Sequence, residues 1–171
     1  APLCTGEGGC MKYVFVGDIH GKVEAVEAAL SKDGTVIFVG DFMDSFDRPP
    51  SDHFKCLVLV LEAIKVGKAR AIYGNHELSY IMPQHRCSGW RQEHSMIMFG
   101  LAEEIKARFE PHVVLAENIL VTHAGLTRQI WAETKLTVNT MDAVLREWWG
   151  EKYAPVHWIG RTRGGPNVCG G

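Results

Sequence analysis

The sequence predicts an α/β fold in which short strands alternate with helices. Runs rich in β-branched and aromatic residues, such as residues 12–16, alternate with segments whose apolar residues recur three and four positions apart. This alternation is typical of layered α/β proteins. Several expected strands also end at a glycine followed by a polar residue, as at Gly17-Asp18 and Gly40-Asp41.

Three strand–helix units are expected in the first two thirds of the chain, with strands at residues 12–16, 35–39 and 69–73. The apolar face of the first helix consists of Val23, Val26, Ala29 and Leu30. Ser51 or Asp52 can cap the second helix. The apolar face of the second helix consists of Phe54, Leu57, Val58, Leu61 and Ile64. A polar loop over residues 83–90 leads to the third helix.

The third helix and the elements after it follow the same reasoning. The apolar face of the third helix consists of Ile97, Leu101, Ile105 and Phe109. Two strands, at residues 113–116 and 119–122, flank a tight turn at residues 117–118. A last helix is marked by Val138, Met141, Leu145 and Trp148.

Composition excludes several classes of protein. With 18 Lys and Arg against 20 Asp and Glu, the net charge of −2 is not that of a strongly basic nucleic-acid binder, so no strong nucleic-acid binding is expected. The long apolar runs exclude intrinsic disorder, and none approaches the length of a membrane span. The five cysteines are odd in number and form no CxxC pair, which favours a reducing, cytoplasmic location.

The two ends of the chain are expected to differ from its middle. Residues 1–10 contain no apolar stretch of a signal peptide and are interpreted as an appended remnant or a disordered N-terminal segment. Residues 11–171 are expected to form a single domain of ordinary size. Because the chain stops in a glycine-rich loop, this domain looks truncated at its C-terminus.

Four short polar clusters follow expected strands. They are GDIHG (17–21), GDFMD (40–44), GNHE (74–77) and THAG (122–125). In open α/β sheets, ligands bind where the carboxyl ends of strands meet their loops. The sequence therefore predicts one functional site to which all four clusters contribute.

The residue types in these clusters suit a pair of divalent cations. If strand geometry continues through Asp18-Ile19-His20, Asp18 and His20 lie on one side and bind a first metal. Asn75 and His123 are candidates for the second metal. The carboxylate of Asp41 can bridge the two cations.

His76 is adjacent to the candidate ligand Asn75 and is free to face a substrate, so it is interpreted as a general acid or an oxyanion donor. Two cations about 3.5–4 Å apart can clamp a phosphoryl group and activate water. The predicted chemistry is therefore phosphoryl transfer to water.

The order DxH, GDxxD, GNHE and HAG resembles the calcineurin-like metallophosphoesterases, in particular the branch of the PPP protein phosphatases. The stretches GDFMDSFDRP, GNHELSYI, HRCSGWR and VTHAGL are similar to a bacterial and bacteriophage group of that superfamily. The resemblance covers residues 12–165. It implies a layered β-sandwich flanked by helices, with a two-metal site at the carboxyl ends of the strands.

The resemblance also implies roles for individual residues. Asp18 and His20 would bind one metal, Asn75 and His123 the other, and Asp41 both. A metal-bound hydroxide would attack the phosphorus, and His76, oriented by Asp44, would protonate the leaving group. The resemblance leaves Mn²⁺ as the first choice of metal, with Fe or Zn²⁺ as alternatives.

Two features depart from the family pattern. The PPP pattern reads GDxxDR, but Ser45 follows Asp44, so the phosphate-binding arginine is missing there. Its replacement is expected to be Arg48, Arg86 or Arg91, and a second phosphate-binding arginine is expected at Arg161 or Arg163. The family also has a later GH segment with a metal-binding histidine. Only His157 follows His123, in VHWIG, so this ligand is expected either to lie beyond Gly171 or not to exist.

The sequence therefore predicts a metal-dependent phosphomonoesterase similar to serine/threonine phosphatases. Its substrate is expected to be a phosphorylated small molecule, a nucleotide or a phosphoprotein, with no membrane partner. A phosphodiesterase, or a nucleotide hydrolase of the diadenosine tetraphosphate type, is the alternative within the enzyme class. The alternative of another class is a scaffold whose site has decayed and which serves as a binding module.

Overall fold

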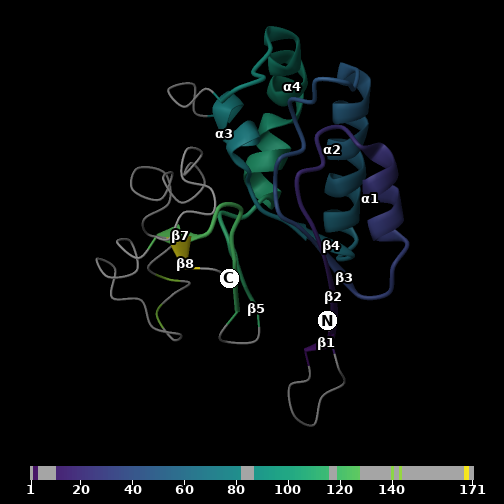
Figure 1. Ribbon diagram of the computed structural model, residues 1–171. Helices are drawn as coiled ribbons and strands as arrows, with labels where there is room; N and C mark the ends of the chain where they lie inside the picture. The colour runs from purple at the N-terminus through teal and green to yellow at the C-terminus, as the bar shows by residue number, and fades with distance from the viewer. Residues whose placement is uncertain are drawn as a thin grey trace. The chain divides into compact units, whose positions relative to one another are not determined.

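The computed structural model describes residues 2–3, 11–81, 87–115, 119–127, 140, 143 and 168–169. The chain divides into two compact units, residues 1–110 and 111–171. Each unit is described by itself (Figure 1). The separate role of residues 1–10 and the single domain over residues 11–171 stay predictions.

A four-stranded sheet forms the centre of the first unit, in the order β1-β2-β3-β4. The strands are β1 (Pro2–Leu3), β2 (Met11–Val16), β3 (Thr35–Phe38) and β4 (Ala69–Ala71). The last three run parallel, with Val14 opposite Val36 and Val36 opposite Ala69, whereas β1 is antiparallel to β2. The central strand is fully buried from Val36 to Phe38, as expected for a parallel sheet covered on both faces.

Four helices accompany this sheet. They are α1 (Val23–Leu30), α2 (Pro50–Lys65), α3 (Asn75–Ile81) and α4 (Gln92–Arg108). Helices α1 and α2 lie side by side (Figure 1), and α2 also packs against β4 and α4. The helix α3 was not predicted, because the GNHE cluster reads as a loop. The helix begins at Asn75, so the cluster itself forms its first turn.

The buried face of α2 is rotated from the predicted one. Phe54 was expected to face the core, but it is 47% exposed. The buried residues of α2 are His53, Cys56, Leu57, Val60, Leu61 and Ala63. The predicted cap at Ser51 or Asp52 is also wrong, since the helix already begins at Pro50, whose fixed φ suits a first helical position. In this helix, which begins at Pro50, His53 lies on the buried face.

The second unit contains two small antiparallel sheets among its described residues. Strand β5 (Val113–Leu115) pairs with β6 (Ile119–Val121), with Val113 opposite Val121. Strand β7 (Leu126–Thr127) pairs with β8 (Val168–Cys169). The predicted strands at 113–116 and 119–122 are confirmed within one residue at their described ends. The predicted last helix lies outside the described residues.

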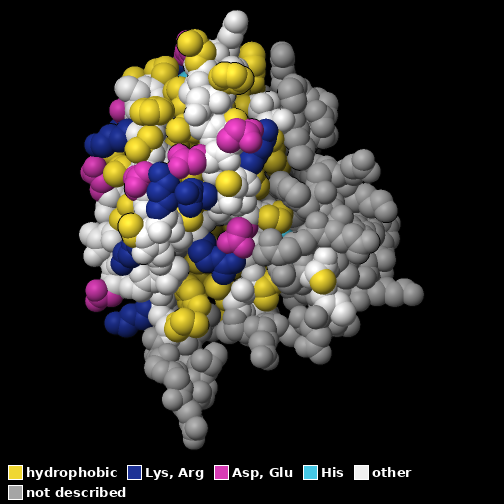
Figure 2. Space-filling view, turned by 180° about the vertical axis from the view of Figure 1, so that it is seen from behind, with side chains coloured by type: hydrophobic (Ala, Val, Ile, Leu, Met, Phe, Trp, Pro, Cys, Tyr) yellow, Lys and Arg dark blue, Asp and Glu magenta, His cyan; other side chains and the backbone are white. Residues whose placement is uncertain are grey.

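The predicted α/β alternation is confirmed in the first unit, whereas the β-sandwich pairing of sheets stays a prediction. On one face of the molecule, Lys and Arg side chains lie among Asp and Glu side chains over the described part (Figure 2). The ion pairs include Lys55 with Glu27 and Arg70 with Glu110. Among the described helices, none has the length and apolar character needed to cross a bilayer.

Candidate metal centre

The loops after β2 and β3 are joined by backbone hydrogen bonds. The Asp18 N–H donates to the Gly40 carbonyl at 3.3 Å, and the His20 N–H donates to the Asp41 carbonyl at 2.9 Å. These bonds extend the pairing of the two parallel strands into their loops. The first two polar clusters therefore meet at the carboxyl edge of the sheet, as predicted.

The third cluster joins them through a close glycine contact. A Cβ on Gly74 would lie 2.3 Å from both the backbone nitrogen and Oδ1 of Asp41. A Cβ on Gly40, whose φ is +85°, would lie 2.4 Å from the Gly74 nitrogen. The ends of β3 and β4 thus approach too closely for any side chain at these two positions.

Four candidate site residues have a left-handed backbone. The φ values are 53° at Asp18, 44° at His20, 60° at Asp41 and 66° at Asp44, and they are the only described non-glycine residues with positive φ. Such conformations cost about 1–3 kcal/mol each and cluster at functional sites. Asp18 and His20 therefore share one side because of this loop geometry, whereas the continued strand geometry that was expected is absent.

The side chains of these residues converge. The Asp41 carboxylate is completely buried, and its Oδ2 lies 3.9 Å from His20 Nε2 and 3.9 Å from His76 Nε2. Asp18 Oδ1 lies 4.0 Å from His20 Nε2. Two atoms that share one cation with bonds of about 2.1 Å are about 3–4 Å apart. The donors are thus spaced for a divalent cation.

His20 has the orientation of a metal ligand. Its Nδ1–H donates to the Met43 carbonyl at 2.6 Å, which leaves the lone pair on Nε2 facing Asp18 and Asp41. Metal-binding histidines usually donate their other ring N–H to a carbonyl or carboxylate in this way. Together with the carboxylates, this oxygen and nitrogen donor set fits Mn²⁺, Fe or Zn²⁺.

His76 is held by two carboxylates. Its Nδ1 lies 2.9 Å from Asp44 Oδ2, and its backbone N–H donates to Asp41 Oδ1 at 3.2 Å. Burial lowers the pKa of His76, but the hydrogen bonds with Asp44 and Cys87 and the charge of Asp41 outweigh it and raise the pKa to about 10. His76 therefore keeps a proton at neutral pH.

The Asp44 carboxylate is the centre of a buried hydrogen-bond network. Its Oδ1 accepts bonds from the Tyr80 hydroxyl and from His94 Nδ1, the latter at 2.9 Å. Burial raises the pKa of Asp44, but the hydrogen bonds from His76, Tyr80 and His94 lower it further than burial raises it. The ionised carboxylate thus fixes the His76 ring, while its role in orienting a general acid stays a prediction.

Glu77 is a site residue to which the sequence reasoning gave no role. Its carboxylate is fully buried and accepts four backbone hydrogen bonds, from Asp41 and Gly74 at Oε2 and from Phe42 and Met43 at Oε1. Burial and the nearby Asp41 raise the pKa of Glu77, while the backbone N–H groups act in the opposite direction. Glu77 thus attaches the 41–43 loop to α3. In the sequence, the only indication of this role was the position of Glu77 in the GNHE cluster.

Two histidines to which the sequence reasoning gave no role, His53 and His94, are also buried. Nε2 of His53 accepts the Ser45 N–H at 3.0 Å, and its Nδ1–H donates to the Pro49 carbonyl at 3.0 Å. His53 thereby fixes the 45–49 loop, and desolvation lowers its pKa. The His94 ring contacts the His53 ring at a centroid distance of 4.6 Å. Their positions on predicted helices were the only sequence signal for this role.

The remaining predicted residues are placed as follows. Arg48 forms an ion pair with Glu24 at 2.5 Å, and Arg91 lies 3.6 Å from Glu93. Asn75 is the first residue of α3, next to His76. The residues outside the described part are Arg86, Arg161 and Arg163. The substrate role of all these arginines stays a prediction.

His123 is described in the second unit, two residues after the end of β6. The predicted meeting of His123 with the ligands of the first unit stays a prediction.

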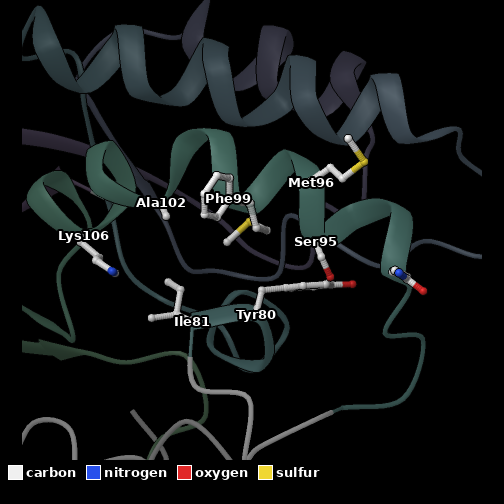
Figure 3. Close-up of a pocket in the computed structure, with 9 residues that line it drawn as sticks. Tyr80, Ile81, Ser95, Met96, Phe99, Ala102 and Lys106 are labelled. Carbon is white, nitrogen blue, oxygen red and sulfur yellow. The ribbon is translucent and has the colours of Figure 1, made fainter.

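A groove of about 570 Å³ lies between α3 and α4. Figure 3 shows Tyr80 and Ile81 on the α3 side, opposite Met96, Phe99 and Ala102 of α4. Tyr80 belongs to both the groove and the Asp44 network, because its hydroxyl bonds to Asp44. The groove and the candidate centre therefore share one side chain.

A comparison with models of protein families identifies the family of this chain. The calcineurin-like phosphoesterase model matches residues 11–170. The chain belongs to this family. The predicted superfamily and fold class are thereby confirmed, and the prediction of a phosphoric ester hydrolase is confirmed at the level of the family. Membership of a bacterial and bacteriophage branch stays a prediction.

A solved structure is also similar. It is a protein serine/threonine phosphatase from Saccharomyces cerevisiae with similarity to human phosphatase PP5. The sequence identity is 23%, and the match covers 68% of this chain and 38% of that chain, with a TM-score of 0.43. The chain of this calcineurin-like phosphoesterase thus spans 38% of the length of that phosphatase. No curated protein matches the sequence.

Proposed function

We propose that this calcineurin-like phosphoesterase hydrolyses phosphate monoesters with two divalent cations, Mn²⁺ being the first choice. The observation that carries the proposal is the position of buried Asp41 between His20 and His76, 3.9 Å from the Nε2 atom of each. One carboxylate thus lies between a candidate ligand and a candidate proton donor, an arrangement that suits metal-assisted phosphoryl transfer.

Asp18 and His20 would hold the first cation, Asn75 and His123 the second, and Asp41 both. When bound, the cations would neutralise charge on the phosphoryl oxygens and lower the pKa of water. The backbone of Asp41 is held by Glu77, so its carboxylate needs little rearrangement to bind. The backbone hydrogen bonds of Asp18 with Gly40 and of His20 with Asp41 likewise hold the first ligand loop in place.

His76 would donate the proton at Nε2 to the leaving oxygen of the ester. The bond from Nδ1 to Asp44 fixes the ring and stabilises its charged form. A general acid must hold its proton at the working pH, and the raised pKa of His76 satisfies this requirement. A positioned acid of this kind contributes about 10²–10⁴-fold to the rate.

The substrate would be a phosphorylated small molecule, a nucleotide or a phosphoprotein. Arg48 and Arg91 lie in or next to the loops that border the centre, and each pairs with a glutamate, so a phosphate would have to compete with Glu24 or Glu93. The cytoplasmic location also belongs to the proposal and rests on the odd, dispersed cysteines.

The test compares para-nitrophenyl phosphate with bis-para-nitrophenyl phosphate, in Mn²⁺ and then in excess chelator. We expect metal-dependent turnover that is faster on the monoester and at least about 100-fold slower in His76→Asn, with unchanged metal content. Asp33→Asn serves as the control, since Asp33 is an exposed loop carboxylate.

Other outcomes would overturn parts of the proposal. Faster turnover of the diester would favour the phosphodiesterase alternative. Stoichiometric metal without turnover of either ester would favour a binding module. Parallel loss of metal and activity in His76→Asn would make His76 a ligand.

A further inference from the structure

Cys87 lies beside the pair formed by His76 and Asp44. Its Sγ is 3.3 Å from His76 Nδ1 and 3.6 Å from Asp44 Oδ2. The Ser79 hydroxyl is 3.4 Å from the same sulfur. Cys87 is half-buried and, like Cys56, is a free thiol. A thiol, an imidazole nitrogen and a carboxylate oxygen therefore converge on the side of His76 that faces away from Asp41.

The spacing of these three atoms suits one tetrahedral cation. With Zn–S bonds of about 2.3 Å and Zn–N and Zn–O bonds of about 2.0–2.1 Å, tetrahedral ligand atoms lie about 3.3–3.6 Å apart. The two sulfur distances, 3.3 and 3.6 Å, meet this expectation, and the distance of 2.9 Å from His76 Nδ1 to Asp44 Oδ2 would lengthen slightly. A water, or the Ser79 hydroxyl, can occupy the fourth position.

The surroundings hold each donor in place. Asp44 is anchored through Oδ1 by Tyr80 and His94, so Oδ2 remains directed at His76 and Cys87. The turn that carries Cys87 packs on the same carboxylate, because a Cβ on Gly89 would lie 3.3 Å from Asp44 Cβ. The donors are thus positioned before any cation arrives.

The end of this turn is fixed to α3 as well. The Trp90 ring stacks on the Tyr80 ring at a centroid distance of 5.9 Å. The Arg91 N–H also donates to the Tyr80 hydroxyl at 3.1 Å. Tyr80 therefore holds both Asp44 and the segment that follows Cys87.

We propose that Asp44, His76 and Cys87 form a separate, inhibitory site for a thiophilic divalent cation such as Zn²⁺. Binding forms Zn–S, Zn–N and Zn–O bonds, and the protons of the Cys87 thiol and of His76 Nδ1 leave to the buffer. No electron is transferred. Thiolate selects Zn²⁺ over Mn²⁺, whereas the oxygen-rich centre at Asp41 accepts both.

Inhibition follows from the two nitrogens of His76 and rests on the proposed function. A cation on Nδ1 displaces the hydrogen bond to Asp44 and prevents formation of the imidazolium. The neutral, metal-bound imidazole could release its Nε2 proton only by becoming an imidazolate, so it is a poor proton donor. The inhibitory cation therefore stops the proton transfer while it leaves the Asp18, His20 and Asp41 ligands in place.

The site itself is tested without any activity measurement, with Co²⁺ as the probe. In a protein carrying Cys4→Ser, Cys10→Ser and Cys169→Ser, Co²⁺ should give a thiolate-to-cobalt charge-transfer band in the near ultraviolet. Cys87→Ser and Cys87→Ala should abolish this band, whereas Cys56→Ser should keep it. Absence of the band in the parent protein, or its persistence in both Cys87 variants, would overturn the proposal.

Inhibition is tested by adding buffered Zn²⁺ to protein in excess Mn²⁺ during hydrolysis of para-nitrophenyl phosphate. Each variant is normalised to its own zinc-free rate. We expect the midpoint of inhibition to rise at least about 10-fold in Cys87→Ser and to be unchanged in Cys56→Ser. Equal midpoints would overturn the inhibitory role. If the chain hydrolyses no ester, the cobalt band still decides the site, so the two failures are distinguishable.

Discussion

The Glu77 carboxylate binds the backbone of Asp41, whose N–H donates to Oε2 at 2.9 Å. The same carboxylate accepts three more backbone N–H groups, so all of its acceptor positions are used. The residue proposed to bridge two cations is therefore held by a carboxylate whose own oxygens are occupied by backbone N–H groups.

Glu77→Gln should destabilise the protein by about 2–4 kcal/mol. The NH2 group of Gln is a donor and would face two of the buried backbone N–H groups, which are donors as well. Each hydrogen bond lost in this way leaves a buried N–H group unsatisfied. Urea denaturation of metal-free protein measures the effect. Glu103→Gln is the control, since the Glu103 side chain is 91% exposed and its ion pair with Lys106 contributes at most about 0.5 kcal/mol. Equal effects of the two changes would contradict the supporting role of Glu77.

Asp41→Asn should reduce kcat/KM more than Asp18→Asn, by at least about 10-fold. Asp41 is buried between His20 and His76, whereas the Asp18 side chain is 62% exposed and lies 4.0 Å from His20. Loss of the shared carboxylate should also lower the metal content toward one cation per chain, which atomic absorption measures. Equal, mild losses in both variants would contradict a bridging role.

Gly74→Ala should destabilise the protein by about 1–3 kcal/mol and reduce activity. The new methyl group would lie 2.3 Å from two atoms of Asp41, so the loops must separate. Gly100→Ala is the matched control, because a Cβ there meets nothing within 4 Å and Gly100 lies within α4. That change should stabilise the protein by about 0.5–1 kcal/mol. Thermal unfolding measures the stability of both variants. An unchanged stability in Gly74→Ala would argue against the close contact.

His76 should make the metal-free protein less stable as the pH rises. Its folded pKa, about 10, exceeds the ordinary value of 6.5. The stabilisation is therefore complete below about pH 6.5 and is lost as the pH approaches 10, by no more than about 5 kcal/mol. Urea midpoints of the parent and of His76→Asn across this range give the difference. Parallel pH profiles would mean that His76 is neutral in the folded protein.

The sequence predicted β2, β3 and β4 and three of the four helices in the first unit because their apolar periodicity is strong, but it did not predict β1. It also predicted that Asp18, His20 and Asp41 would meet, since polar residues follow parallel strands. It missed α3 because Asn75 to Ile81 is short and its first turn consists of the polar residues of a cluster. A local pattern that reads as a loop can become helical when tertiary contacts satisfy its ends.

The supporting residues could not be predicted for a different reason. Glu77, His53 and His94 act through partners that are distant in sequence, and a single polar residue on a helix carries no periodic signal. The left-handed backbone at Asp18 and His20 was also missed, because the alternating pattern reads as a continued strand. Both errors concern tertiary contacts, which periodicity does not record.

The four left-handed residues have a consequence for when the site takes shape. Their backbone conformations are unfavourable in an isolated chain, so folding of the surrounding sheet and Glu77 must impose them before a cation binds. The backbone around the candidate ligands is therefore preorganised, and an incoming cation has little of it left to order. Replacing Asp41 with a β-branched residue, for which a positive φ is a greater strain, would disturb this backbone independently of the loss of a ligand.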